Sequence, residues 1–211
     1  TRRAAIEAID RACIKFNLNK KDLPYFRTLH SLAFLQAGLN HSQVITAEHY
    51  QDISDWLRIG KFYLDVNNMD QGPYKDIGYG DKFLEIINMA RILQKPLKEI
   101  YTQSLVPLKT DWDRVSYVNR GIHHYKKAKE LYDYTDMLEV FVNMNLAPKL
   151  DVVFIDEAQD LSPIQWKMVQ QLEQNSKRCF VAGDDDQAIF RYAGADVNHF
   201  VNLKGEVSLL N

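Results

Sequence analysis

Two groups of carboxylates stand directly after apolar segments in the last third of the chain. Asp156 and Glu157 follow the apolar run 152–155, and the three aspartates 184–186 closely follow the run 179–182. Continuous β-branched and aromatic runs of this length predict strands that are buried on both faces of a parallel sheet. Because ligands of open α/β sheets bind at the carboxyl ends of the strands, the two runs predict a magnesium and phosphate site.

The pair Asp156 and Glu157 suits this chemistry. An aspartate at a strand end can hold Mg²⁺, usually through water, and the adjacent glutamate can orient a water for attack on a terminal phosphate. An alternative is an acidic loop that precedes the next helix, where carboxylates are favoured by the helix dipole. The residue types alone leave both interpretations open.

The segments around these carboxylates predict a strand, helix, strand unit. The strands are expected at 151–155 and 178–182, and the helix begins at Ser162, which forms a capping box with Gln165. Such a unit indicates a parallel crossover. The fold class is therefore α/β.

The rest of the chain is largely helical by its apolar spacing. Asparagine, glycine and proline residues predict a loop over 65–80. A helical block between α/β-like ends is typical of an inserted helical lobe. The helices are expected over about 1–17, from Thr28, from Thr46 to Gly60, from Asp81 to Pro96, around 115–132 and from Thr135.

Composition excludes several classes of protein. The 211 residues carry 26 basic and 28 acidic side chains, so nucleic-acid binding would have to use a local face. Residues 1–21, with six Lys or Arg and two acids, and residues 114–129, with five Lys or Arg and no acid, offer such faces, although both could be solvated helix surfaces. Two distant cysteines do not suit structural zinc, and no apolar run approaches the ~20 residues of a membrane span. We therefore expect a cytoplasmic protein with no membrane partner.

The acidic segments also carry a family resemblance. Residues 156–160 and 183–196 resemble motifs II and III of the UvrD/Rep-type superfamily-one helicases. Residues 1–5, 28–32 and 133–138 resemble three earlier motifs, namely the end of motif Ia, motif Ib and a short acidic-aromatic motif. The resemblance implies a partial RecA-like parallel sheet of the P-loop NTPase type with a helical insertion. The implied division is a first part of the RecA-like domain at 1–45, a helical lobe at 46–130 and the remainder of the RecA-like domain at 131–211.

The resemblance also implies roles at the nucleotide site, with ATP and Mg²⁺ as cofactors. Asp156 would be the Mg²⁺ ligand and Glu157 the catalytic base. Gln159, helped by Asp160, would couple the nucleotide site to its neighbours. Gln187 would sense the γ-phosphate.

Other positions match DNA contacts of the family. Phe190 and Tyr192 would be platforms for bases of a single strand, a stacking interaction worth ~1 to 3 kcal/mol per base. Their alternative role is core packing, and His30 could equally be a structural histidine. Motif III ends here in Tyr-Ala-Gly where Trp-Arg-Gly is common, so Arg191 could partly replace a lost cationic contact. The matching positions are Thr1, Thr28, His30, Phe190, Arg191 and Tyr192.

The chain also departs from the family pattern. It contains no Gly-x-x-x-x-Gly-Lys-Ser/Thr sequence, and only a short tail follows motif III. We expect an internal piece of an ATP-dependent DNA helicase from a bacterium or phage-infected cell, acting 3′ to 5′ on single strands and duplex junctions. Its partner would be the missing second RecA-like domain, and we expect the piece to be inactive without that domain and the phosphate-binding loop. The alternatives are a motor-dead single-strand-binding or interaction module and the motor part of a helicase-nuclease.

Overall fold

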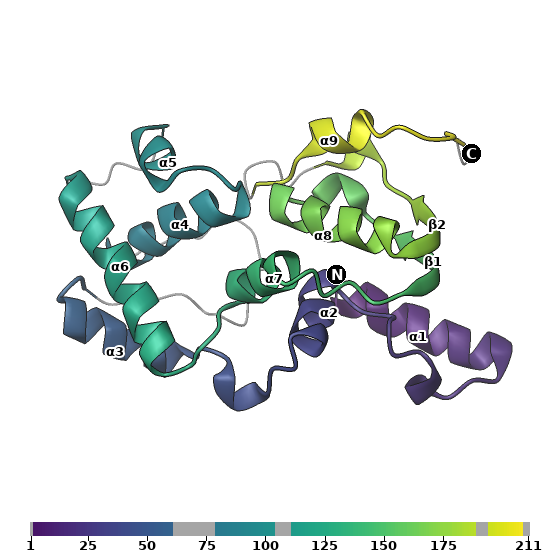
Figure 1. The fold of residues 1–211 in the computed structure, drawn as a ribbon, viewed down its shortest axis with the longest axis horizontal. Helices are drawn as coiled ribbons and strands as arrows, with labels where there is room; N and C mark the ends of the chain where they lie inside the picture. Colours follow the sequence, from purple (N-terminus) through teal and green to yellow (C-terminus); the bar gives the residue numbers. More distant parts are fainter. Residues whose placement is uncertain (1, 61–78, 104–110, 189–193, 209–211) are drawn as a thin grey trace.

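The computed structural model describes residues 2–60, 79–103, 111–188 and 194–208 (Figure 1). Within these ranges, four short 3₁₀ helices accompany the main elements: η1 (Lys20–Asp22), η2 (His41–Gln43), η3 (Ala158–Asp160) and η4 (Asp185–Gln187). The main elements are α1 (Arg2–Phe16), α2 (Leu29–Gln36), α3 (Ala47–Leu57), α4 (Tyr79–Ile92), α5 (Leu97–Gln103), α6 (Trp112–Ala128), α7 (Tyr134–Asn143), β1 (Leu150–Ile155), α8 (Pro163–Gln174), β2 (Ser176–Val181) and α9 (Val197–Val201).

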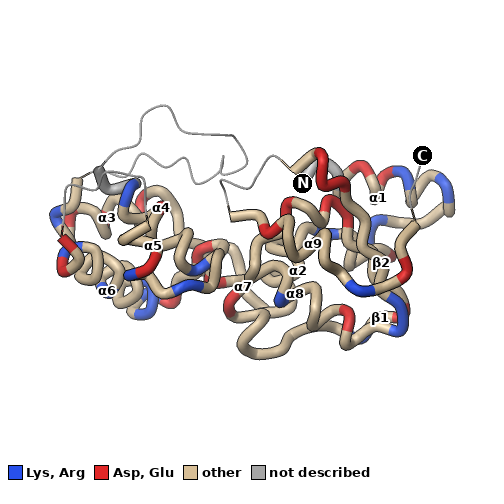
Figure 2. Tube along the Cα trace, turned by 90° about the horizontal axis from the view of Figure 1, so that it is seen from above, with Lys and Arg blue, Asp and Glu red and all other residues tan. Residues whose placement is uncertain are grey.

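Two lobes lie side by side. Figure 1 shows α3, α4, α5 and α6 together on the left, which we call the helical lobe. The strands lie on the right with α1, α2, α8 and α9, which we call the sheet lobe, and α7 lies between the two groups. Basic and acidic residues occur on both lobes (Figure 2), as the near-neutral charge of the chain suggests.

The predicted strand, helix, strand unit is confirmed. β1 and β2 pair in parallel, with Val153 opposite Cys179 and Ile155 opposite Val181, and α8 connects them. The described part of the chain is thus α/β, mostly helical with a small two-stranded parallel sheet.

The prediction that both faces of these strands are buried was wrong. Val153 and Ile155 are buried in the core that contains α8 residues, but Val152, Phe154 and Phe180 are 44%, 75% and 48% exposed. The rings of Phe154 and Phe180 stack on the open face, with centroids 4.9 Å apart. The apolar run correctly shows that both faces are apolar, but within the described residues a helix covers only one of them.

Each of the two lobes has its own hydrophobic core. The core of the sheet lobe includes Ala33 of α2, Phe141 of α7 and Trp166 of α8. The main core of the helical lobe includes Ile53 and Val118, from α3 and α6. Full burial of a large apolar side chain contributes roughly 1.5–3 kcal/mol, so each lobe has its own source of stability.

Most helix starts follow their predicted caps. Thr28 caps α2 by accepting from the backbone N–H of Ser31, and Ser162 with Gln165 caps α8. α3 begins after Thr46 as predicted. The polar contacts in the first turn of a helix can be predicted from the sequence, because they join residues that are three positions apart.

Other boundaries differ from the prediction. α3 ends at Leu57, and its C-cap is Arg58, which adopts the left-handed conformation (φ 52°), rather than Gly60. α4 begins at Tyr79, two residues before the expected cap Asp81, and α7 is capped by Asp133 rather than starting at Thr135. α5 was not predicted, and most of the predicted loop 65–80 lies outside the described residues. No helix in the described ranges is both long enough and apolar enough to cross a bilayer.

Candidate functional site at the strand ends

The ends of β1 and β2 are joined by backbone hydrogen bonds. The N–H of Ala182 donates to the carbonyl of Ile155 at 2.8 Å, and the N–H of Ala158 donates to the carbonyl of Ala182 at 3.0 Å. Asp156 and Glu157 lie in the turn between these bonds, and both are exposed. Glu157 has φ 54°, a left-handed conformation that is uncommon for a residue with a side chain. The structure therefore places the pair at a tight turn beside the segment that follows β2.

Gln159 links the two acidic segments. Its side chain is buried, with 1% of the residue exposed. Its Nε2 donates to Oε2 of Glu157 at 2.8 Å, and its Oε1 accepts from the backbone N–H of Asp184 at 3.1 Å. One amide thus orients the Glu157 carboxylate and holds the start of the 184–187 segment. The functional roles of these residues remain predictions, but their juxtaposition is observed.

Close packing fixes this link. A Cβ on Gly183 would lie 2.6 Å from Oε1 of Gln159 and 2.8 Å from Cζ of Phe200, nearer than real Cβ atoms come. Glycine at this position therefore lets the backbone after β2 approach the Gln159 amide.

Gln187 lies at the end of the same acidic segment. Its Nε2 donates to Oδ2 of Asp184 at 2.6 Å, and its side chain is exposed. The described contact holds Gln187 to Asp184 rather than to Asp156 or Glu157. The segment is anchored at Asp184 and presents the Gln187 amide to solvent.

The donor set of this turn suits magnesium. The described residues contain no group of three or more His, Cys, Asp or Glu side chains arranged around a metal position. Mg²⁺ does not need one, since it binds through one or two carboxylates together with water and substrate phosphates. The exposed carboxylates of Asp156 and Glu157 fit that pattern. Nearby, burial and the charge of Glu157 raise the pKa of Asp160, whose Oδ1 is buried and has no partner among the described residues.

The predicted DNA-binding residues divide into two groups. Thr1, Phe190, Arg191 and Tyr192 lie outside the described residues. Thr28 and His30 lie at the start of α2, where the His30 ring meets Tyr134 of α7 edge-to-face at 5.8 Å. Thr28 uses its hydroxyl as the helix cap, so a structural role is observed there.

Comparison with known proteins identifies the family of the chain. A family model described as the UvrD/REP helicase N-terminal domain matches residues 1–208. The chain belongs to this family.

Several curated relatives match parts of the chain, and most of them are DNA helicases by name. The chain is 28% identical over 111 residues to the putative ATP-dependent DNA helicase YjcD of Bacillus subtilis, a match covering 47% of the chain and 14% of that protein. It is 28% identical over 89 residues to the ATP-dependent DNA helicase Rep of Buchnera aphidicola, covering 38% and 13%. It is 29% identical over 108 residues to the RecBCD enzyme subunit RecB of Buchnera aphidicola, covering 44% and 9%. The matched region spans less than a sixth of each of these relatives.

Sequence reasoning missed a cluster of buried charges in this family member. Arg91 of α4 donates to Asp133 at 2.9 Å, to Asp136 at 2.6 Å and to both carboxylate oxygens of Glu139 at 3.1 and 2.7 Å. Lys126 of α6 donates to Asp133 and Asp136, both at 2.6 Å. We call these five residues the ionic cluster. It joins the helical lobe to α7.

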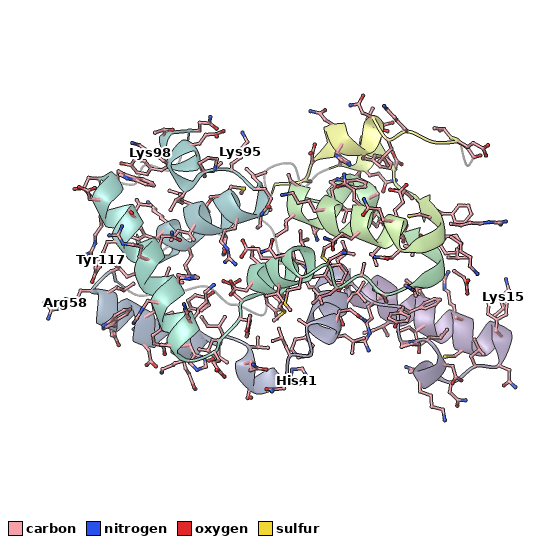
Figure 3. All side chains as sticks on the ribbon, in the orientation of Figure 1. Lys15, His41, Arg58, Lys95, Lys98 and Tyr117 are labelled. Atoms are coloured by element: carbon pink, nitrogen blue, oxygen red, sulfur yellow. The ribbon has the colours of Figure 1, made fainter. Side chains whose placement is uncertain are left out.

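Lys126 corrects the prediction of a basic face over 114–129. Only 6% of Lys126 is exposed, so its charge belongs to the ionic cluster and not to the surface. Val118 and Ile122 precede it at four-residue spacing on the buried face of α6. Because Lys126 continues the spacing of these buried apolar residues, its position on the buried face of the helix could have been predicted from the sequence. Figure 3 shows Arg58 and Tyr117 on the helical lobe, where both are exposed.

The ionic cluster alters the ionisation of its members. Burial opposes ionisation of Asp133, but the charges of Arg91 and Lys126 hold its pKa well below the usual range. Burial and the adjacent Asp133 charge raise the pKa of Asp136. The charged state of Asp133 therefore depends on both cations.

Proposed function

We propose that this chain is part of an ATP-dependent DNA helicase that hydrolyses Mg-ATP at Asp156 and Glu157 and moves 3′ to 5′ along single-stranded DNA. The observation that carries the proposal is the Gln159 amide, which joins the Glu157 carboxylate to the segment bearing Gln187. Family membership and the helicase names of the relatives support it.

The chemistry follows from the geometry of the turn. When bound, Mg²⁺ would neutralise charge on the phosphates. Asp156 would hold it, directly or through water. The Gln159 bond occupies Oε2 of Glu157, and we assign Oε1 as the acceptor of the proton from the attacking water. Gln187 would contact the γ-phosphate.

The architecture supports a larger RecA-like domain. The open apolar face that carries Phe154 and Phe180 suits further sheet or helix packing, so we propose that β1 and β2 belong to a RecA-like sheet. The separate cores of the two lobes support the division at 1–45, 46–130 and 131–211.

The remaining parts of the proposal concern partners. Phe190 and Tyr192 would stack on bases, Arg191 would add a cationic contact, and Thr1, Thr28 and His30 would contact the DNA backbone at single strands and duplex junctions. A second RecA-like domain would complete the nucleotide site, in a cytoplasmic setting. The 211 residues alone should not hydrolyse ATP, because they contain no phosphate-binding loop sequence.

Glu157→Gln in the full-length protein tests the catalytic assignment. The amide keeps the shape of the side chain but cannot take a proton, so we expect ATP turnover to fall roughly 10²- to 10⁴-fold while nucleotide binding persists. Glu173→Gln, an exposed change at the other end of α8, is the control and should leave turnover unchanged.

Turnover and nucleotide binding should be measured on the same preparations. Normal turnover of Glu157→Gln would remove Glu157 from the catalytic role. Wild-type protein that binds single strands but neither binds nor hydrolyses ATP would favour a motor-dead DNA-binding module instead.

A further inference from the structure

Within the described ranges, the chain passes between the sheet lobe and the helical lobe at two adjacent places. It leaves η2 for α3 through residues 44–46, and it returns from α6 to α7 through residues 130–133. These two crossings run in parallel and are joined by backbone hydrogen bonds. The N–H of Ile45 donates to the carbonyl of Tyr132 at 3.0 Å, and the N–H of Tyr132 donates to the carbonyl of Gln43 at 2.8 Å. Two segments that lie side by side form one line of attachment, and a lobe attached along one line alone could rotate about it.

The end of α4 provides a second attachment, which extends away from this line. Arg91 forms ion pairs with three carboxylates of the α7 segment, from Asp133 to Glu139. Asp133 directly follows the second crossing, whereas Glu139 lies about 9 Å further along at the rise of an α-helix. Figure 3 shows the two attachments on opposite sides of the junction, with Lys95 at the end of α4 and His41 just before the first crossing.

Further contacts strengthen the second attachment. Lys126 of α6 donates to Asp133 and Asp136, both at 2.6 Å. Oε1 of Gln94, after the end of α4, accepts from Nζ of Lys167 on α8 at 2.7 Å. Both α7 and α8 contribute residues to the core of the sheet lobe. The helical lobe is therefore joined to the sheet lobe by side chains of two of its helices as well as by the two crossings.

The ionic cluster is suited to fixing an orientation. The side chains of Arg91 and Lys126 are only 18% and 7% exposed. A buried ionic network is weak evidence for stability, because apolar residues of similar volume can replace one without loss. Separating its charges is costly, however, because each buried charge is then left unpaired. Rotation of the helical lobe about the crossings would separate these charges.

We infer that the ionic cluster is a clamp that fixes the orientation of the helical lobe on the sheet lobe. The helical lobe is then a rigid arm and not a lid that is hinged at the two crossings. The inference gives a role to the acidic residues of the 133–138 segment, which the proposed function leaves unused. It does not depend on nucleotide chemistry or on DNA binding.

The distance between two spin labels, one on each lobe, tests the clamp. The labels are placed at His123→Cys on α6 and Glu173→Cys on α8, which are both exposed positions. They are introduced into the full-length protein after its other cysteines have been replaced by alanine. Double electron–electron resonance then gives the distribution of distances between the lobes. We expect one narrow distribution, and a broad distribution in this otherwise unchanged protein would overturn the inference.

Arg91→Lys should release the clamp. Lysine keeps the charge but lacks the planar fork that reaches three carboxylates. We expect the inter-lobe distance distribution to widen about twofold, because the lobes then sample more than one orientation. Arg120→Lys is the matched control, because this exposed arginine of α6 donates to Ser116 of the same helix. Equal widths in the two variants would overturn the inference.

A second label pair separates loss of orientation from general loosening. Lys98→Cys on α5 and His123→Cys on α6 lie within the helical lobe, and both positions are exposed. Their distance distribution should keep its wild-type width in Arg91→Lys. Equal widening of this pair and of the inter-lobe pair would show that the cluster supports the fold of the lobe and does not fix its orientation.

Glu139→Gln provides a milder variant should Arg91→Lys not fold. It removes the charge that lies furthest from the crossings and leaves Asp133 and Asp136 with both cations. We expect the inter-lobe distribution to widen, but less than in Arg91→Lys. Glu99→Gln, which removes a partly exposed ion pair with Lys95 inside the helical lobe, is the control. Equal widths in Glu139→Gln and Glu99→Gln would contradict a clamp that acts along α7.

Discussion

The carboxylates of this protein lie in two contrasting environments. In the ionic cluster, Asp133, Asp136 and Glu139 are matched with Arg91 and Lys126 and are largely shielded from water. At the strand ends, five carboxylates are exposed, and no ion pair is recorded for them within the described part of the chain. They are Asp156, Glu157, Asp184, Asp185 and Asp186.

The two environments suit two different roles, namely a structural role for the ionic cluster and the ligand-binding role that we propose for the strand-end carboxylates. Buried carboxylates that are satisfied by fixed cations have no capacity left for a ligand, and they hold elements together. Exposed carboxylates at the ends of neighbouring parallel strands keep that capacity, and a divalent cation would supply the missing positive charge. The proposed function accordingly assigns nucleotide chemistry to the second group and not to the first.

The largest expected contrast is in stability. Arg91→Met removes the cation shared by three carboxylates, and breaking a buried network of this kind costs about 3–5 kcal/mol. Asp156→Asn removes an exposed charge from the strand-end turn and should change the free energy of unfolding by less than about 0.5 kcal/mol. Urea unfolding of both variants measures the difference. Equal losses would show that the two carboxylate groups do not differ in structural role.

A smaller effect is expected from the packing beneath the strand-end turn. Gly183→Ala places a Cβ against Gln159 and Phe200, and overpacking of this type costs about 1–3 kcal/mol. Gly205→Ala, where a Cβ would meet nothing within 4 Å, is the control. Thermal unfolding compares them, and an unaffected Gly183→Ala would show that the Gln159 amide is not tightly held.

Local sequence patterns predicted the parts of this fold that depend on local chemistry. The apolar runs that end in carboxylates predicted the positions of both strands and of the turn. Thr28 and Ser162 predicted the starts of two helices. The burial of Lys126 could not be predicted from its charge, because its partners lie on α7 across a turn. The exposure of Phe154 and Phe180 could not be predicted for the same reason. The sequence of a strand shows that a face is apolar, but it does not show which element covers that face.

The roles of the site residues stay predictions. The motif resemblance named Asp156, Glu157, Gln159 and Gln187, and the structure shows that the Gln159 amide contacts both Glu157 and Asp184. The contact between Gln159 and Asp184 joins residues 25 positions apart, so it depends on the parallel register of β1 and β2 and not on local sequence. The close approach of Gly194 to Ile92 of α4 could not be predicted for the same reason, because these residues are far apart in the sequence.

The most direct test of the central claim is nucleotide affinity with and without magnesium in the full-length protein, compared between wild type and Asp156→Asn. Glu173→Gln, which changes an exposed carboxylate at the other end of α8, serves as the control. We predict that wild type and Glu173→Gln bind ATP more tightly with magnesium, and that Asp156→Asn loses this dependence. Full magnesium dependence in Asp156→Asn would contradict the assignment of the strand-end turn as the Mg-ATP site.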